Sequence, residues 1–230
     1  MGKYIYKTET HLHCSETSNC SSVSAAEYVH RFKEAGYTTI FVSDHYYRKR
    51  FKDCETEEQY RVAIDSQLKG YRTAKAEGDR VGLTVLLACE FHIEDDDYLF
   101  LGIDESFFYH KEIGTMSPEE LFAFCNEHGY TLFAAHPFRD GCTPKAHAVH
   151  GFELINTSYN HYADNHNEKA LELAKTHPHL LTTGGSDAHT LNDVGTGGIL
   201  TEEPVRSVDD YLRILRSGNY EIINNKPEGR

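Results

Sequence analysis

Six segments of this sequence run through β-rich, apolar residues and then stop at or beside a residue type that binds metal ions. They span residues 9–13, 39–45, 83–90, 131–136, 152–156 and 180–189. Because the carboxyl ends of parallel strands gather at one face of an α/β fold, we expect these polar side chains to converge there. The pattern therefore predicts one site that holds several metal ions.

The first two candidate ligands are His11 and His13. Residues two apart on a strand point to the same side, so both imidazoles can reach one ion while Leu12 packs on the other side. The pair alone is a weak signal, because a chain with 15 histidines contains about one His-x-His by accident. Its position at the end of the first expected strand makes it stronger.

Asp187 and His189 repeat this spacing with a carboxylate and an imidazole. A mixed set of histidines and carboxylates suits zinc, manganese or iron, and a carboxylate can bridge two ions where an imidazole cannot. A plain turn is the alternative, since Ser and Asp are favoured there. Glu90 ends an apolar strand, and a buried carboxylate needs a metal ion, an arginine or an exposed loop as its partner.

His45 and His136 each close a β-rich run. A single histidine in such a place is more often a core or capping residue than a ligand, so the argument depends on the position that they share with the other candidates. Cys14 and Cys20 flank the His-x-His pair, and one of them is a weaker candidate ligand. His92, on the face of Glu90, is another.

Two basic features could bind an anion. Arg139 lies three residues beyond His136 and can make a bidentate contact with phosphate. The Arg-Lys-Arg run at 48–50, with Lys52, follows His45 in an expected loop at the mouth of the site. A solvated loop is the alternative interpretation of this run.

Strands and helices alternate along the chain, which predicts an α/β fold. We expect helices at 24–35, 57–77, 117–128, 163–176 and 207–216, and strands at 4–13, 38–43, 83–90, 98–103, 130–135, 151–156, 179–183, 196–200 and 219–223. Continuous apolar strands favour a parallel sheet covered on both sides. About seven such units favour a barrel over an open doubly wound sheet, which stays the alternative.

Composition limits the remaining choices. Residues 1–230 fit one domain. The absence of long apolar runs and of an apolar segment in 1–7 predicts neither a membrane span nor a secretory signal. Six cysteines without a CxxC pair are interpreted as reduced thiols of a cytoplasmic protein. The net charge of −13 argues against binding of nucleic acid, but not against a small anionic substrate beside bound cations. Oligomeric state is left open.

These residues together resemble the polymerase and histidinol phosphatase (PHP) family of metal-dependent phosphoesterases. The matching motifs are Thr10-His11-Leu12-His13, Val42-Ser43-Asp44-His45, Ala88-Cys89-Glu90, Ala135-His136-Pro137, Phe152-Glu153-Leu154-Ile155-Asn156 and Gly185-Ser186-Asp187-Ala188-His189. They run from residue 10 to residue 189, so the resemblance covers most of the chain.

The resemblance implies a distorted, TIM-like (β/α)7 barrel that carries two to three divalent ions, zinc, manganese or iron, at the strand ends. The ligands that it implies are His11, His13, Glu90 and Asp187 for one ion, Glu90 and His136 for a second, and His45 and His189 for a third. Many relatives add a ligand from a Ser-Asp-Gly sequence after the first motif, whereas residues 14–20 here contain no Asp. Glu16 is our predicted substitute. Asp97 and His92 are weak candidates for completing the second site.

The resemblance also implies an activity, the hydrolysis of a phosphate ester of a small molecule by a metal-activated water. Arg139 would bind a phosphoryl oxygen, and His45 is one candidate for protonating the leaving group. Histidinol phosphate is the best-known substrate of stand-alone relatives, and nucleotides or phosphotyrosine peptides are others. The alternatives are a catalytically impaired metal-binding regulatory domain and an amidohydrolase-type metallohydrolase. The amidohydrolase alternative is less favoured, because no lysine that could be carbamylated stands at the end of an expected strand.

Overall fold

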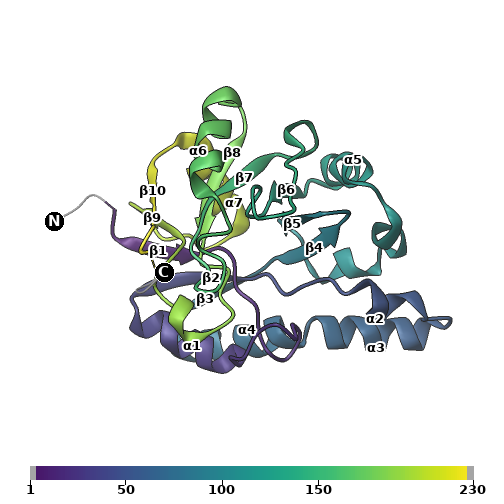
Figure 1. Ribbon diagram of the computed structural model, residues 1–230. Helices are drawn as coiled ribbons and strands as arrows, with labels where there is room; N and C mark the ends of the chain where they lie inside the picture. Colours follow the sequence, from purple (N-terminus) through teal and green to yellow (C-terminus); the bar gives the residue numbers. More distant parts are fainter. Residues whose placement is uncertain (1–3, 227–230) are drawn as a thin grey trace.

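The computed structural model describes residues 4–226, which form two five-stranded sheets with helices around them (Figure 1). The first sheet has the order β10 (Tyr220–Ile222), β9 (Ile199–Thr201), β1 (Tyr6–Glu9), β2 (Tyr37–Val42) and β3 (Thr84–Leu87). The second has the order β4 (Cys89–Ile93), β5 (Asp96–Leu101), β6 (Thr131–Ala134), β7 (Gly151–Asn156) and β8 (Leu181–Gly185). The predicted α/β class is confirmed.

The helices begin and end where the sequence provides caps. They are α1 (Ala25–Glu34), α2 (Arg48–Lys52), α3 (Glu57–Gln67), α4 (Lys69–Val81), α5 (Pro118–His128), α6 (Asn167–Thr176) and α7 (Val208–Ser217), with short 3-10 turns at Glu105–Tyr109, Lys111–Thr115, Ala146–Ala148 and Leu191–Asp193. The expected cap of α5 forms: Ser117 and Glu120 make a reciprocal capping box around Pro118. No described helix is long and apolar enough to cross a membrane.

The hydrophobic core fills the space between the sheets and beneath the helices. Phe41 of β2, Leu99 of β5 and Phe133 of β6 are fully buried in one cluster, and Tyr211 of α7 packs into the same cluster. A second cluster lies under α1 and α4, which cover the first sheet (Figure 1). The polar residues at the strand ends lie outside these apolar clusters.

The two sheets meet near the ends of their strands. β3 passes into β4 through Ala88, and an isolated parallel bridge pairs His45 with Glu90. A second bridge pairs Leu12, after β1, with Ala188, after β8. Within residues 4–226 these single bridges are not extended into ladders, so the closed barrel that we predicted is not observed as a continuous sheet.

Several predicted elements were wrong in detail. The sheets are mixed, not parallel, because β5 runs antiparallel to both β4 and β6, and β9 runs antiparallel to β1. A tight turn at Glu94, with φ of 57°, reverses the chain after β4. The turn contains no glycine, so the sequence did not indicate it. The helix expected at 57–77 is two helices that break at Leu68, and α2 lies in the expected loop. The single domain over 1–230 stays a prediction, since 1–3 and 227–230 lie outside the described residues.

Gly70 allows α4 to approach the segment that follows the His-x-His pair. A Cβ on Gly70 would lie 2.3 Å from Asp44 Oδ2 and 2.8 Å from Cys14 Cβ. Its backbone N–H donates to Thr17 Oγ1 at 2.9 Å. The helix and this segment are therefore in contact at a point where a side chain has no room.

We expect Gly70→Ala to lower the free energy of unfolding by about 1–3 kcal/mol, the usual cost of overpacking a tight contact. Gly114→Ala is the matched control, because a Cβ there would lie 3.6 Å from its nearest neighbour, Tyr46 Oη. Urea denaturation of both variants measures the difference. If Gly70→Ala were as stable as Gly114→Ala, the close contact between α4 and Asp44 would be contradicted.

Candidate metal centre

Glu90 is the centre of a cluster of buried imidazoles. Its Oε1 lies 3.2 Å from His11 Nε2 and 3.2 Å from His136 Nε2. Its Oε2 lies 3.2 Å from His13 Nε2 and 3.0 Å from His45 Nδ1. These residues come from the ends of four different strands, so the convergence that the sequence predicted is observed.

Asp187 is the second acid of the cluster. Its Oδ1 is 3.3 Å from both His11 Nε2 and His13 Nε2 and 3.5 Å from His189 Nδ1. Its other oxygen accepts a hydrogen bond of 2.6 Å from Arg139 Nη2. Asp187 and Glu90 therefore face the same imidazoles from two sides.

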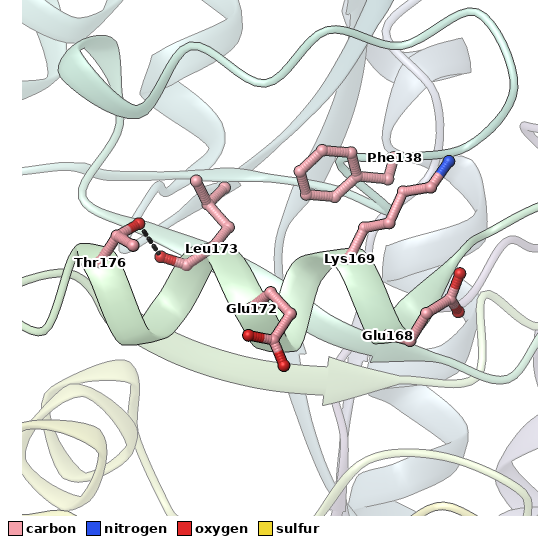
Figure 2. Close-up of a pocket in the computed structure, with 6 residues that line it drawn as sticks. All are labelled: Phe138, Glu168, Lys169, Glu172, Leu173 and Thr176. Atoms are coloured by element: carbon pink, nitrogen blue, oxygen red, sulfur yellow. Dashed lines mark hydrogen bonds between the residues drawn. The ribbon is translucent and has the colours of Figure 1, made fainter.

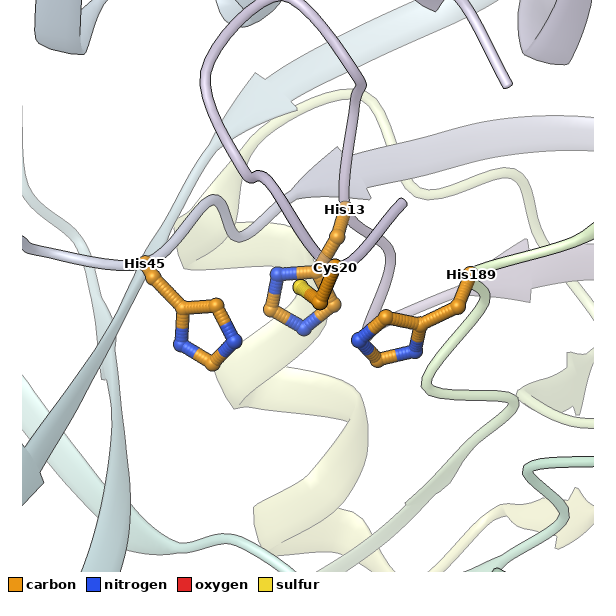
Figure 3. Close-up of side chains that lie close together, drawn as sticks. All are labelled: His13, Cys20, His45 and His189. Carbon is orange, nitrogen blue, oxygen red and sulfur yellow. The ribbon is translucent and has the colours of Figure 1, made fainter. Parts of the chain in front are cut away.

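The side chains form three groups that could each hold a metal ion. In each group the candidate ligand atoms lie within 4.8 Å of one another: His11, His13 and Asp187; Glu90, Asp97 and His136; and His13, Cys20, His45 and His189. The last group is drawn in Figure 3, where the three rings and the thiol face a common space. Seven of the eight predicted ligands thus fall in these groups.

The donor set fits divalent transition metal ions. His11 Nε2 and His13 Nε2 lie 3.1 Å apart although both rings are fully buried, an arrangement that requires a cation or a proton between them. On its other side, His11 Nδ1 contacts Glu153 Oε1 at 3.1 Å. A carboxylate behind a histidine is typical of metal-binding imidazoles, since it fixes the orientation of the ring.

The buried acids and imidazoles of the cluster shift one another's pKa values. Burial opposes charge on His13, but the hydrogen bonds that its ring donates to Asp187 and Glu90 outweigh it and raise its pKa to about 9. The pKa of His11 is also raised, with Asp187 and Glu90 overcoming burial. Burial acts against ionised Glu90 too, yet His11 and His45 hold its pKa well below the ordinary value. The cluster therefore favours the ionised form of both acids and the protonated form of the inner histidines.

Two candidate ligands have a positive φ, a backbone conformation that residues other than glycine seldom adopt. His136 has φ of 28° and Asp187 has φ of 48°. Strain of this kind costs on the order of 1–3 kcal/mol at each position and persists where surrounding contacts impose it. The backbone N–H of His136 donates to Glu153 Oε2 at 2.9 Å, which is one such contact.

Glu16 is not where we predicted it. Both of its carboxylate oxygens accept from the backbone N–H of Ala25, at 3.1 and 3.0 Å, at the start of α1. The first turn of that helix needs an acceptor, and a carboxylate is favoured there. Cys20, the weaker candidate, takes the place beside His45 and His189 instead. Asp97 joins the group of Glu90, whereas His92 contacts Asp97 from an exposed position.

The two residues that we predicted to act on substrate are both engaged with the cluster. Arg139 donates from Nη2 to Asp187 and from Nε to Asn165 Oδ1 at 2.7 Å, so its main role in the structure is to hold Asp187. Burial, then repulsion by His13, lowers the pKa of His45 to about 4. A neutral imidazole at neutral pH is suited to binding a metal ion and is a poor proton donor.

Sequence reasoning missed the acids that support the ligands. Glu9 Oε1 accepts from the backbone N–H groups of Thr10, His11 and Ser186 at 2.9–3.0 Å. Asp44 Oδ1 accepts from the N–H of Cys14 and from Ser18 Oγ, both at 2.7 Å. Both acids stand inside the matching motifs or beside them, but nothing in their spacing distinguishes a support from a ligand.

One cavity adjoins the cluster, and a second adjoins the first. One of about 310 Å³ is lined by Cys20, His45, Tyr46, Tyr47, His92 and Asp97. The next, of about 410 Å³, shares Tyr46 and includes Arg48, Lys52 and Lys111. A larger hollow of about 570 Å³, between α6 and Phe138, is drawn in Figure 2, and its lining contains Glu168, Lys169 and Glu172 but none of the clustered ligands. The first two cavities are the candidates for substrate.

Comparison with known proteins supports the resemblance in the last part of the described chain and the fold over most of it. Residues 164–220 match the family model described as PHP-associated. No curated protein matches the chain. The fold is similar to a two-domain protein from Bacteroides vulgatus that contains a predicted PHP-like metal-dependent phosphoesterase, with a TM-score of 0.66 and 16% identity over 98% of this chain. The chain covers 66% of that protein, so it is shorter than this relative.

Two further solved structures share the fold. A protein from Bifidobacterium adolescentis, proposed to be a metal-dependent phosphoesterase, has a TM-score of 0.55 and 14% identity over 92% of this chain and 96% of its own. An amidohydrolase from Chromobacterium violaceum, solved with bound sulfate and no metal, has a TM-score of 0.53 and 18% identity over 82% and 90%. The match over residues 164–220 supports the resemblance to the PHP family, and the solved structures show a shared fold, so the chain is an α/β protein with a cluster of potential metal ligands.

We expect metal binding to release protons and to strengthen as the pH rises. His11 and His13 have raised pKa values, so at pH 7 they carry protons that a metal ion must displace, and binding gains up to about tenfold per proton for each pH unit until the pKa of His13, about 9, is reached. Zinc titration against a competing chelator at pH 6, 7 and 8 measures this. An affinity independent of pH would be inconsistent with protonated ligands.

Proposed function

We propose that this chain is a PHP-type phosphoesterase that hydrolyses a phosphate ester of a small molecule with two to three divalent ions of zinc, manganese or iron. The observation that carries the proposal is the contact of one carboxylate, Glu90, with four imidazoles. A carboxylate in that position can bridge two ions, and adjacent ions are the usual means of splitting phosphate esters. The family resemblance points to the same chemistry.

When bound, the ions would supply an activated water and neutralise negative charge on the phosphoryl oxygens. The residues of the chain have distinct tasks around them. His11, His13 and Asp187 would hold the inner ion, and Glu90 would link it to the ion at His136 and Asp97. Arg139 keeps Asp187 oriented through the contact of 2.6 Å. His45 would serve as a ligand, since its lowered pKa leaves it neutral.

The surroundings of the site favour a small anion as substrate. The whole chain carries a charge of −13, yet the second cavity, which shares Tyr46 with the cavity at the cluster, is lined by Arg48, Lys52 and Lys111. A local basic patch in an acidic protein draws anions to that place and gives little affinity for long nucleic acid. Histidinol phosphate is the first substrate to test. The unpaired cysteines support the cytoplasmic location that we propose.

An amidohydrolase reaction is the second candidate, because one similar structure is an amidohydrolase. That structure binds sulfate, a tetrahedral oxyanion with the shape of phosphate. In addition, none of the described strands of this chain ends on a lysine that could be carbamylated to bridge two ions. These two observations favour phosphate as the group that is attacked.

We expect the purified protein to hydrolyse p-nitrophenyl phosphate or bis-p-nitrophenyl phosphate when zinc or manganese is added. His11→Ala should lower kcat at least about a hundredfold, since it removes a ligand and a contact to both acids. The matched control is His147→Ala, an exposed histidine paired with Glu119, which should retain activity.

Turnover that is absent with every metal, in protein that still binds metal, would favour the regulatory alternative. Turnover of amides but not of phosphate esters would favour the amidohydrolase.

We expect Lys52→Ala to raise KM for a phosphorylated metabolite by roughly two- to fivefold with little change in kcat, the effect of one exposed charge contact. Lys75→Ala is the control, because Lys75 pairs with Asp79 on α4 and lines neither cavity beside the cluster. Initial rates with a panel of phosphorylated metabolites measure both. An unchanged KM for every substrate would contradict a role of the basic cavity in substrate binding.

A further inference from the structure

Cys20 lies in the third group of potential ligands together with His13, His45 and His189 (Figure 3). One candidate ligand atom of each residue is within 4.8 Å of those of the others. His45 and His189 stand on opposite sides of the thiol in Figure 3, with His13 below it. Cys20 also lines the cavity of about 310 Å³ that opens beside His45.

Cys20 is exposed, but the backbone around it is held on both sides. On one side, Ser18 Oγ donates to Asp44 Oδ1 at 2.7 Å and accepts from the N–H of His45 at 3.1 Å. The N–H of Asn19 donates to Tyr47 Oη at 3.1 Å. Each of these contacts ties the segment to the strand end that carries His45.

On the other side, the segment is tied to the second histidine of the group. The N–H of Ser22 donates to the backbone oxygen of His189 at 3.0 Å, and Ser22 Oγ donates to the same oxygen at 3.2 Å. Cys20 therefore lies between anchors to the His45 segment and anchors to the His189 segment. These backbone contacts fix how far Cys20 lies from His45 on one side and from His189 on the other.

The carboxylate that would compete for this position is directed elsewhere. Both oxygens of Glu16 accept from the N–H of Ala25, and Asp44 is occupied with Cys14 and Ser18. Among the described residues, the thiol of Cys20 is thus the donor added to His45 and His189, beside Glu90 and Asp187, which contact the same two rings from the centre of the cluster.

We propose that Cys20 is the third-site ligand that, with His45 and His189, makes this site selective for thiophilic ions such as zinc, cobalt or iron(II) over manganese and magnesium. Thiolate and imidazole donors suit the first group, whereas manganese and magnesium prefer oxygen. The proposal rests on the metal-dependent function proposed above and specifies the identity of its third ion.

Cobalt(II) reports directly on a sulfur ligand through a thiolate-to-cobalt charge-transfer band in the near ultraviolet. Titration of the metal-free wild-type chain with cobalt should produce this band. Cys20→Ser should remove it and weaken the last ion bound by at least about tenfold, since loss of an outer-shell partner alone costs roughly 10–100-fold. Cys142→Ser is the matched control, a half-buried free thiol outside the three groups, and should keep the band.

Elemental analysis after dialysis against each metal gives the second measurement. Wild type should retain one more equivalent of zinc than of manganese, and Cys20→Ser should lose that difference. A wild-type cobalt complex without the band, or a band that persists in Cys20→Ser, would overturn the proposal. Phosphate ester assays on the same samples separate the two ideas. A band without turnover refutes the phosphoesterase alone, and turnover without a band refutes the role of Cys20 alone.

Discussion

The fold depends on holding two carboxylates, Glu90 and Asp187, among buried imidazoles. Both side chains are almost completely buried, and burial of an unpaired charge is very costly. The imidazoles around them, with Arg139 behind Asp187, are what makes their ionised state tolerable. In a protein of net charge −13, this local need for positive charge is the physical basis for attracting cations.

Each segment that carries ligands is held by a buried acid of its own. Glu9 accepts from the backbone before His11, and Glu153 accepts from the N–H of His136. Asp44 holds the segment that begins at Cys14, and Asp193 Oδ2 accepts from the N–H of His189 at 3.0 Å. All four acids accept from backbone N–H groups, and Glu153 contacts the His11 ring as well, so they fix strand ends that lack ladder partners. The strained backbone at the site persists because such contacts impose it.

The sequence predicted the positions of most ligands because they follow a simple rule: a polar residue of a ligand type at the end of an apolar run. That rule predicted that His11, His136 and Asp187 converge, which the structure shows, and it predicted the class of fold. It could not predict the antiparallel β5, whose reversal at Glu94 depends on a left-handed residue without glycine, or the break at Leu68 between two good helix formers. Closure of the ring into a barrel depends on long-range pairing at single bridges, which no local pattern encodes.

The choice of ligand after the His-x-His pair shows where local rules stop. A carboxylate in a segment next to a metal site is the chemically natural prediction, and it was wrong for Glu16 because the start of α1 competes for the same side chain. Four residues further on, Cys20 is placed by hydrogen bonds to segments about 25 and 167 residues away in sequence, around His45 and His189. The identity of a ligand in a loop is therefore set by which groups the neighbouring helix and strands already occupy. Since those neighbours differ little in composition from other helices and strands, only the folded structure distinguishes an oxygen site from a sulfur site.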